Sequence, residues 1–188
     1  MTRRFVAIGI PEQVRTALDE SLADARGHWE GLRPTRADDW HLTVAFVGEL
    51  ADDALEQLVE VVGAGLADSA LPDELALDGA GRFGRRVLWA GVCDRPEGRL
   101  AALGETIQQA CAAAGLPVEQ RPVHPHVTLA RARRGAQVRA GHEAQAADAV
   151  ASVVAHGVAA WRPEGVEVWA SHLGAGPARY EVEAVVPG

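Results

Sequence analysis

Two short segments of this chain each place a histidine and a threonine two positions apart. The segments read HLTVAFVG over residues 41–48 and HVTLAR over residues 126–131, one in each half of the 188-residue sequence. Both are apolar and rich in β-branched residues, which is typical of buried strands, and in a strand residues i and i+2 share one face. Each segment is therefore predicted to present an imidazole and a hydroxyl side by side.

Two histidines that face one substrate can supply paired acid and base catalysis. Hydrolysis of a phosphate diester needs a base that deprotonates water and an acid that protonates the departing sugar oxygen. Imidazole suits both tasks because its unperturbed pKa of about 6.5 lies near working pH. One histidine must be neutral and the other protonated, so we expect the rate to fall on both sides of an optimum pH.

Other side chains of the two segments could stabilise the phosphate. Phosphoryl oxygens need hydrogen-bond donors, and the hydroxyls of Thr43 and Thr128 are candidates for that role. Arg131, three residues after Thr128, could add a charged guanidinium fork. A site of this kind, with His41 and His126 as its acid and base, requires no metal ion and no cofactor.

The same histidines allow two other interpretations. Histidine in an apolar run is commonly a hydrogen-bonded core residue, but that does not explain why a threonine follows both at the same spacing. His124 lies two residues before His126, and the two could bind zinc together with His41. Against zinc, Pro125 restrains the chain beside His124, and metal binding gives no reason for the threonines. The remaining histidines are interpreted as hydrogen-bonded core residues: His28, His142, His156 and His172.

The composition is that of an ordinary globular protein, with 48% hydrophobic and 23% charged residues. The length allows one domain or two small lobes packed together. No apolar run approaches the roughly 18 residues of a membrane span. The apolar run over residues 5–10 stops at Pro11 without a cleavage site, so we interpret it as a first strand and expect a cytoplasmic protein with no membrane partner.

The net charge of −8 argues against a protein that coats long nucleic acids. It does not exclude a site for one terminal phosphate. The charge balance reverses locally after the second histidine segment, where an arginine-rich loop is predicted without an acidic residue among its arginines. A solvated loop is the alternative interpretation of these residues: Arg131, Arg133, Arg134 and Arg139.

Strands and helices are predicted to alternate irregularly along the chain. The hairpins imply antiparallel pairing, which indicates the α+β class. The repeated histidine segment suggests two similar lobes that form one continuous domain over residues 1–188. Strands are expected over residues 3–10, 41–48, 75–83, 87–93, 126–131, 166–173 and 180–185, helices from residues 11 and 52 and over 98–114 and 144–155, a loop over 32–39, and turns over 84–86 and 174–177.

The two segments resemble the paired motifs of the 2H phosphoesterases. His41, Thr43, Phe46 and Gly48 match the first motif, and residues 126–131 match the second. Within this superfamily the chain is most similar to the bacterial and archaeal RNA 2′,3′-cyclic phosphodiesterases, also called 2′-5′ RNA ligase-like proteins. The likeness covers essentially the whole chain, since it extends to residues 4–8, 11, 87–91, 121–122, 125–126 and 178–181.

This resemblance implies two pseudo-symmetric lobes with antiparallel sheets, each of which supplies a His-x-Thr-x strand to a central cleft. It implies hydrolysis of an RNA 2′,3′-cyclic phosphate to a 2′-phosphomonoester. The family's roles fall on His41 as proton donor and His126 as proton acceptor, with Thr43, Thr128 and Arg131 as phosphate ligands. The expected partner is an RNA 3′ terminus or a related small nucleotide, bound by a monomer.

Several functions remain open at this stage. Another 2H substrate is possible, such as a cyclic phosphate of ADP-ribose or a 2′-5′ oligonucleotide, and so is an RNA-end binding protein without turnover. The family's alternative name also implies ligation, which would be the reverse reaction on a 5′-hydroxyl end. Trp40 could stack on a terminal base or belong to the core, and Phe46 is interpreted as a core residue.

Overall fold

The computed structural model describes residues 1–133, 142–156, 160–172 and 178–188. These residues form eight strands, joined by antiparallel pairs in the order β4-β5-β6-β3-β1-β7-β8, with β2 added beside β6. The strands are β1 Thr2–Gly9, β2 Leu32–Pro34, β3 His41–Leu50, β4 Glu74–Phe83, β5 Val87–Arg95, β6 His126–Ala132, β7 Gly165–His172 and β8 Arg179–Pro187. The helices are α1 Glu12–Ser21, α2 Leu55–Ala67, α3 Arg99–Ala113 and α4 His142–Ala155, with short 3-10 turns at Ala25–His28, Ala37–Asp39 and Asp52–Ala54.

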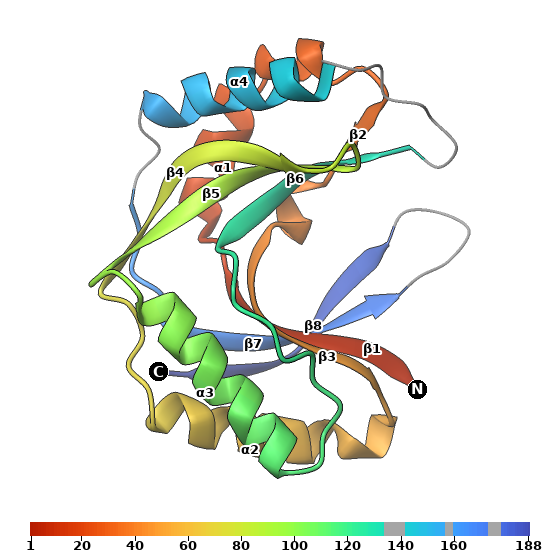
Figure 1. The fold of residues 1–188 in the computed structure, drawn as a ribbon, viewed down its shortest axis with the longest axis vertical. Coiled ribbons are helices and arrows are strands. Elements are labelled where there is room, and N and C mark those ends of the chain that lie inside the picture. Colours follow the sequence, from red (N-terminus) through yellow and green to blue (C-terminus); the bar gives the residue numbers. More distant parts are fainter. Residues whose placement is uncertain (134–141, 157–159, 173–177) are drawn as a thin grey trace.

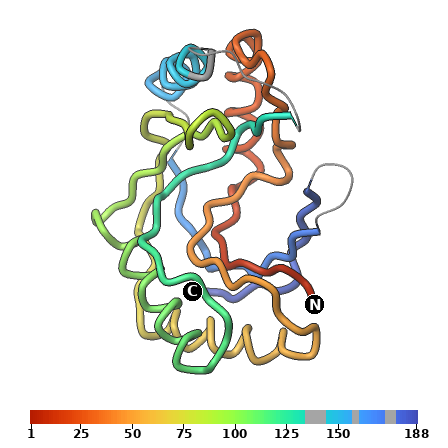
Figure 2. Tube along the Cα trace, turned by 45° about the vertical axis from the view of Figure 1, so that its right-hand side comes forward, coloured from red at the N-terminus to blue at the C-terminus, as the bar shows by residue number. Residues whose placement is uncertain are grey.

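The strands divide into two lobes that meet where β3 runs beside β6. The pairing of these two strands is Leu42 opposite Val127, after which they diverge. We call the side with β3, β1, β7 and β8 the His41 lobe, and the side with β6, β5, β4 and β2 the His126 lobe. Figures 1 and 2 show these lobes as the lower and upper halves of the molecule. The predicted α+β class and two-lobed arrangement are confirmed.

Each lobe covers its sheet with helices. In the His41 lobe α3 packs on β3 and on α2, and α2 packs on β8. In the His126 lobe α4 packs across β4 and β5, and α1 lies on the same side of the molecule (Figure 1). The helices bury apolar residues at a spacing of three or four, which is the period of one helix face, as Leu100, Leu103 and Ile107 of α3 illustrate.

Both motif strands contain an extra residue directly after the threonine. The register between β1 and β3 shifts so that Ala7 faces Thr43 while Val6 faces Ala45, which leaves Val44 unmatched. The register between β5 and β6 shifts in the same way at Leu129. Such a bulge reverses the alternation of faces beyond it. The fifth residue after each histidine therefore returns to the histidine face.

Most of the predicted elements are confirmed, including the alanine-rich helix now seen as α4. The loop predicted over residues 32–39 is wrong in part, because residues 32–34 form strand β2, which pairs with β6. Arg131 belongs to β6, as the strand predicted over residues 126–131 has it, so the alternative of a solvated loop is wrong for this residue. Arg134, Arg139 and the predicted turn over residues 174–177 lie outside the described residues. Within the described part of the chain, no helix is long and apolar enough to cross a membrane.

Candidate active site

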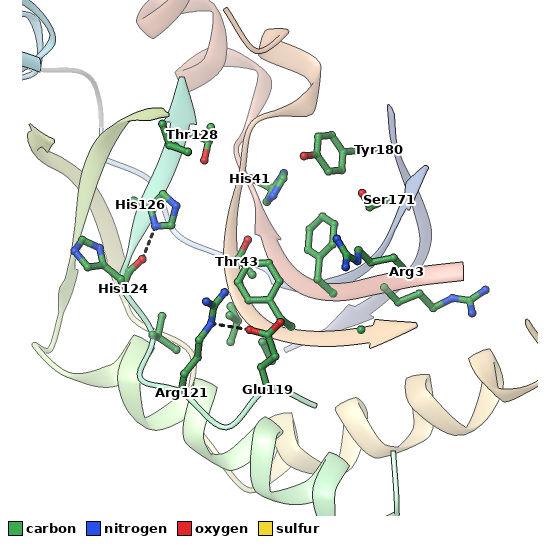
Figure 3. Close-up of a pocket in the computed structure, with 18 of the residues that line it drawn as sticks. Arg3, His41, Thr43, Glu119, Arg121, His124, His126, Thr128, Ser171 and Tyr180 are labelled. Atoms are coloured by element: carbon green, nitrogen blue, oxygen red, sulfur yellow. Dashed lines mark hydrogen bonds and ion pairs between the residues drawn. The ribbon is translucent and has the colours of Figure 1, made fainter. Parts of the chain in front are cut away.

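A cleft of about 640 Å³ brings together the five residues that the sequence predicts as a site. His41 and Thr43 line it from β3, and His126, Thr128 and Arg131 line it from β6. Figure 3 shows the two histidines and the two threonines projecting from these strands toward a common space. The arrangement follows from strand alternation, since the residues between each histidine and threonine, Leu42 and Val127, are fully buried.

The register between β3 and β6 relates the two motifs by an approximate two-fold axis. Leu42 pairs with Val127 in an antiparallel sense, and each residue directly follows the histidine of its motif. Continuing that register by one residue in each direction sets His41 across from Thr128, and Thr43 across from His126. Each histidine is thus matched with the hydroxyl of the other motif, so a phosphate between them can contact both motifs.

Both imidazoles are held by the same kind of hydrogen bond. Nδ1 of His41 lies 2.8 Å from the carbonyl oxygen of Asp39, and Nδ1 of His126 lies 2.6 Å from that of His124. A carbonyl oxygen accepts and cannot donate, so Nδ1 is the protonated nitrogen in both rings. Nε2 is left as the reactive atom: it accepts a proton when the ring is neutral and donates one when the ring is protonated.

His41 lies among aromatic rings of the His41 lobe. Its ring centroid is 4.7 Å from that of Phe5, 5.1 Å from Trp169 and 5.3 Å from Tyr180. Burial is the main cause that lowers the pKa of His41 from 6.5 to about 4, with smaller lowering effects from the charges of Arg131 and His126 and an opposing, raising effect from the Asp39 carbonyl. His41 is therefore neutral in the free protein near neutral pH, because its surroundings disfavour the imidazolium.

His126 has a comparable aromatic environment in the His126 lobe. Its ring centroid is 4.9 Å from that of Phe83, 5.7 Å from His124 and 6.1 Å from Trp89. Burial lowers the pKa of His126, and neighbouring charges, including those of Arg131 and Arg121, lower it as well. The Trp89 ring covers Gly81 on the adjacent strand, where any Cβ would collide with the indole.

The three-histidine zinc set is not assembled by the described side chains. Among them, no three histidine, cysteine, aspartate or glutamate residues converge on a point where a metal could bind. The Nδ1 atoms of His41 and His126 are engaged by backbone carbonyls, and the ring of His124 meets that of His126 edge-on. The donor set thus fits two separate proton-transfer groups better than a zinc site.

The structure decides or changes the interpretation of several single residues. Trp40 is 1% exposed and belongs to the core, which is one of its two predicted alternatives, so it is not available to a base. Phe46, interpreted as a core residue, lines the cleft. Phe5 and Tyr180 also line it, and sequence reasoning missed both as site residues, because only the pairing of β1, β3, β7 and β8 brings them to His41. The side chain of His142 is not described, and the other histidines interpreted as core residues are exposed on the surface: His28, His156 and His172.

The lowered pKa of His41 predicts an acid-sensitive fold. The unfolded chain takes up a proton at this residue below about pH 6.5, whereas the folded protein does so only near pH 4. The free energy of unfolding should therefore fall by about 3 kcal/mol from this residue as the pH drops through that window. Urea denaturation at a series of pH values measures this loss. Between pH 6.5 and pH 4 the free energy of unfolding of His41→Asn should fall by about 3 kcal/mol less than that of the wild type. An identical loss in both proteins would contradict the burial of His41.

Comparison with known proteins places this geometry in a family. Residues 11–171 match the family model described as the 2′-5′ RNA ligase superfamily. The chain is 32% identical over 135 residues to an RNA 2′,3′-cyclic phosphodiesterase of Geobacillus stearothermophilus, an alignment that covers 70% of this chain and 42% of that protein. It is 33% identical over 137 residues to the enzyme of that name from Escherichia coli, covering 69% of this chain and 71% of the relative.

Solved structures give the same result over nearly the full length. Escherichia coli LigT in complex with 3′-AMP superposes with a TM-score of 0.70 at 26% identity, covering 98% of this chain and 96% of that one. A Thermus thermophilus protein, TT0787, superposes with a TM-score of 0.72 at 26% identity, covering 98% and 97%. Because the family model matches residues 11–171 of this chain, and because the two lobes pair their histidine strands, this chain belongs to the 2′-5′ RNA ligase superfamily.

Proposed function

We propose that this protein hydrolyses the 2′,3′-cyclic phosphate at an RNA 3′ terminus to a 2′-phosphomonoester. The observation that carries the proposal is the pair of His-x-Thr strands in one cleft, where both histidines keep Nε2 for proton transfer. The curated relatives bear the name of this activity, and LigT binds 3′-AMP, an adenosine phosphate. The part of the chain that the family model matches, residues 11–171, includes both motifs.

In this reaction water attacks phosphorus in line with the bond to the 3′ oxygen. His126, neutral at Nε2, accepts a proton from the attacking water. His41, protonated at Nε2, gives a proton to the departing 3′ oxygen, so the P–O3′ bond breaks and the phosphate stays on the 2′ oxygen. The two motifs are nearly symmetric, so their geometry does not distinguish the acid from the base. The family resemblance supports this assignment.

The phosphoryl oxygens are held by donors from both lobes. We assign this role to the hydroxyls of Thr43 and Thr128 and to the guanidinium of Arg131, which reaches the cleft face because of the bulge in β6. These donors are fixed on strands before the substrate arrives, which favours the charge that develops on the phosphoryl oxygens. The mechanism uses no metal ion.

The remaining parts of the proposal concern the protein as a whole. We propose that residues 1–188 act as one two-lobed domain and as a monomer, because both halves of the site come from strands that are paired within one chain. We also propose that the protein is cytoplasmic, because the apolar run over residues 5–10, which could resemble a signal peptide, lies in strand β1 as far as Gly9. Smaller nucleotides are a second class of substrate to test, since LigT has also been solved with ATP and with NADP⁺.

A direct product assay tests the proposed activity. The purified protein is incubated, with excess EDTA, with a short RNA that ends in a 2′,3′-cyclic phosphate, and the position of the product phosphate is identified. We expect a 2′-phosphate, formed at a rate that EDTA does not change. Activity that requires added zinc would contradict the metal-free mechanism, and no turnover in either condition would favour another 2H substrate or a protein that binds RNA ends.

The lowered pKa values of the two histidines predict that kcat/KM has its maximum at acidic pH. The pH profile of kcat/KM reports the free enzyme, in which the pKa of His41 is about 4 and that of His126 is lowered from 6.5. The maximum of the bell should therefore lie below pH 6.5, whichever histidine is the acid. The kcat profile should shift to higher pH, because a bound phosphate anion raises the pKa of both imidazoles. A kcat/KM optimum above pH 7 would contradict this.

A change of leaving group separates the acid from the base. With the cyclic phosphate, His41→Ala and His126→Ala should each lower kcat on the order of 10²–10⁴-fold. In a 4-nitrophenyl phosphodiester the leaving group, 4-nitrophenolate, departs without needing a proton. His41→Ala should therefore lose far less activity on this substrate. His126→Ala should keep its full loss, because water must still be deprotonated. The opposite pattern would exchange the two roles.

A further inference from the structure

Arg121 enters the cleft from the loop between α3 and β6. Its guanidinium carbon lies 4.2 Å from the centroid of the Phe46 ring, and its Nε lies 3.2 Å from a carboxylate oxygen of Glu119. The side chain is 54% exposed and lines the cleft. Figure 3 shows the guanidinium pointing toward the space between Thr43 and His126. A planar guanidinium over an aromatic face is restrained in orientation while its remaining donors stay available.

The backbone of this loop is fastened to the His41 lobe. The backbone N–H of Glu119 donates to the carbonyl of Phe46 at 2.8 Å, and that of Arg121 donates to the side-chain oxygen of Gln108 at 3.1 Å. Gln108 is 5% exposed, and its own carbonyl accepts from the side chain of Gln120 at 3.1 Å. Arg121 is therefore presented from a held position, although it does not lie on a strand.

The two-fold relation of the motifs gives Arg121 a counterpart. Phe46 and Arg131 are each the fifth residue after a motif histidine, and both return to the cleft face through the bulges of β3 and β6. The second motif thus supplies a guanidinium from its own strand. The first motif supplies a phenyl ring at the equivalent position, and the guanidinium that rests on this ring comes from Arg121.

The two guanidiniums differ in their relation to the histidines. Arg131 is close enough to lower the pKa of both His41 and His126, which is expected of a charge beside the reacting phosphate. Arg121 contributes to the lowering at His126 and stands at the Phe46 end of the cleft. Arg3 and Arg4 also line the cleft, but Arg121 is the arginine held on the Phe46 ring. In a protein of net charge −8, an exposed cation at this place can bind a second anionic group of the substrate.

We propose that Arg121 binds the phosphodiester on the 5′ side of the terminal nucleotide, so that the cleft selects an RNA end over a mononucleotide. The proposal rests on the proposed function. The departing 3′ oxygen must face His41, so the terminal nucleoside lies toward the His41 lobe, and its 5′ phosphate is one ribose away from the reacting phosphorus. The guanidinium exchanges its ion pair with Glu119 for a bidentate pair with this phosphate.

Two substrates that differ by this phosphodiester and the adenosine attached to it test the inference. kcat/KM is measured for adenosine 2′,3′-cyclic phosphate and for the dinucleotide ApA that ends in a 2′,3′-cyclic phosphate. Arg121→Gln should reduce the preference for the dinucleotide about tenfold, mainly through KM. The slope of log kcat/KM for the dinucleotide against log salt should become shallower by about 0.7, as for the loss of one contact to a single strand.

Arg95→Gln is the matched control. Arg95 forms an exposed ion pair of similar geometry, with its Nε 3.3 Å from Glu74, and it does not line the cleft. This variant should keep the wild-type preference. Equal losses on both substrates in Arg121→Gln would overturn the inference, because they would mean that Arg121 acts on the reacting phosphate, and an unchanged preference would overturn it as well.

A binding measurement keeps the inference separate from the proposed function. Calorimetric titration compares adenosine 2′-phosphate with ApA that ends in a 2′-phosphate, and requires no turnover. The wild type should bind the dinucleotide more tightly than adenosine 2′-phosphate. In Arg121→Gln the ratio of the two dissociation constants should shrink about tenfold. If the wild type turns over neither cyclic substrate, the proposed function fails, while the inference stands or falls on this difference.

Discussion

The site depends on the contact between β3 and β6. Leu42 and Val127 pair at the junction of the two lobes and are fully buried, so the residues on either side of each must point the other way. That constraint places an imidazole and a hydroxyl from each strand on a shared face. Because the pair is antiparallel, its register extended by one residue places each histidine across the cleft from the threonine of the other motif. The lobes carry their sheets and helices on either side of this contact.

The bulges set which other side chains join the site. Without the unmatched residues Val44 and Leu129, strand alternation would turn Phe46 and Arg131 away from the histidines. With them, one end of the cleft receives a guanidinium and the other receives an aromatic ring. The two half-sites are thus alike at the histidines and differ at the flanking positions, which would allow the cleft to distinguish the two ends of an asymmetric substrate.

The sequence predicted the centre of the site better than its surroundings. The His-x-Thr spacing, repeated in apolar runs, was enough to predict His41, Thr43, His126 and Thr128 on one cleft, because strand alternation is a local rule. Phe5 and Tyr180 reach His41 through pairing between strands far apart in the chain, which no local pattern reveals. Strand β2 was missed because three residues with a proline carry little strand signal, and its pairing with β6 is a tertiary contact.

The hydrogen bonds from the two histidines to backbone carbonyls also bear on the protonation state that the proposed reaction would leave in the cleft. Each of these hydrogen bonds fixes the tautomer without fixing the charge. In the proposed mechanism, one turnover would leave His126 protonated and His41 neutral, which is the reverse of the starting state. That product state is the one from which a 2′-phosphate would close back to the cyclic ester. A second forward cycle would therefore require both imidazoles to exchange protons with solvent, and the cleft that both rings line is the route for that exchange.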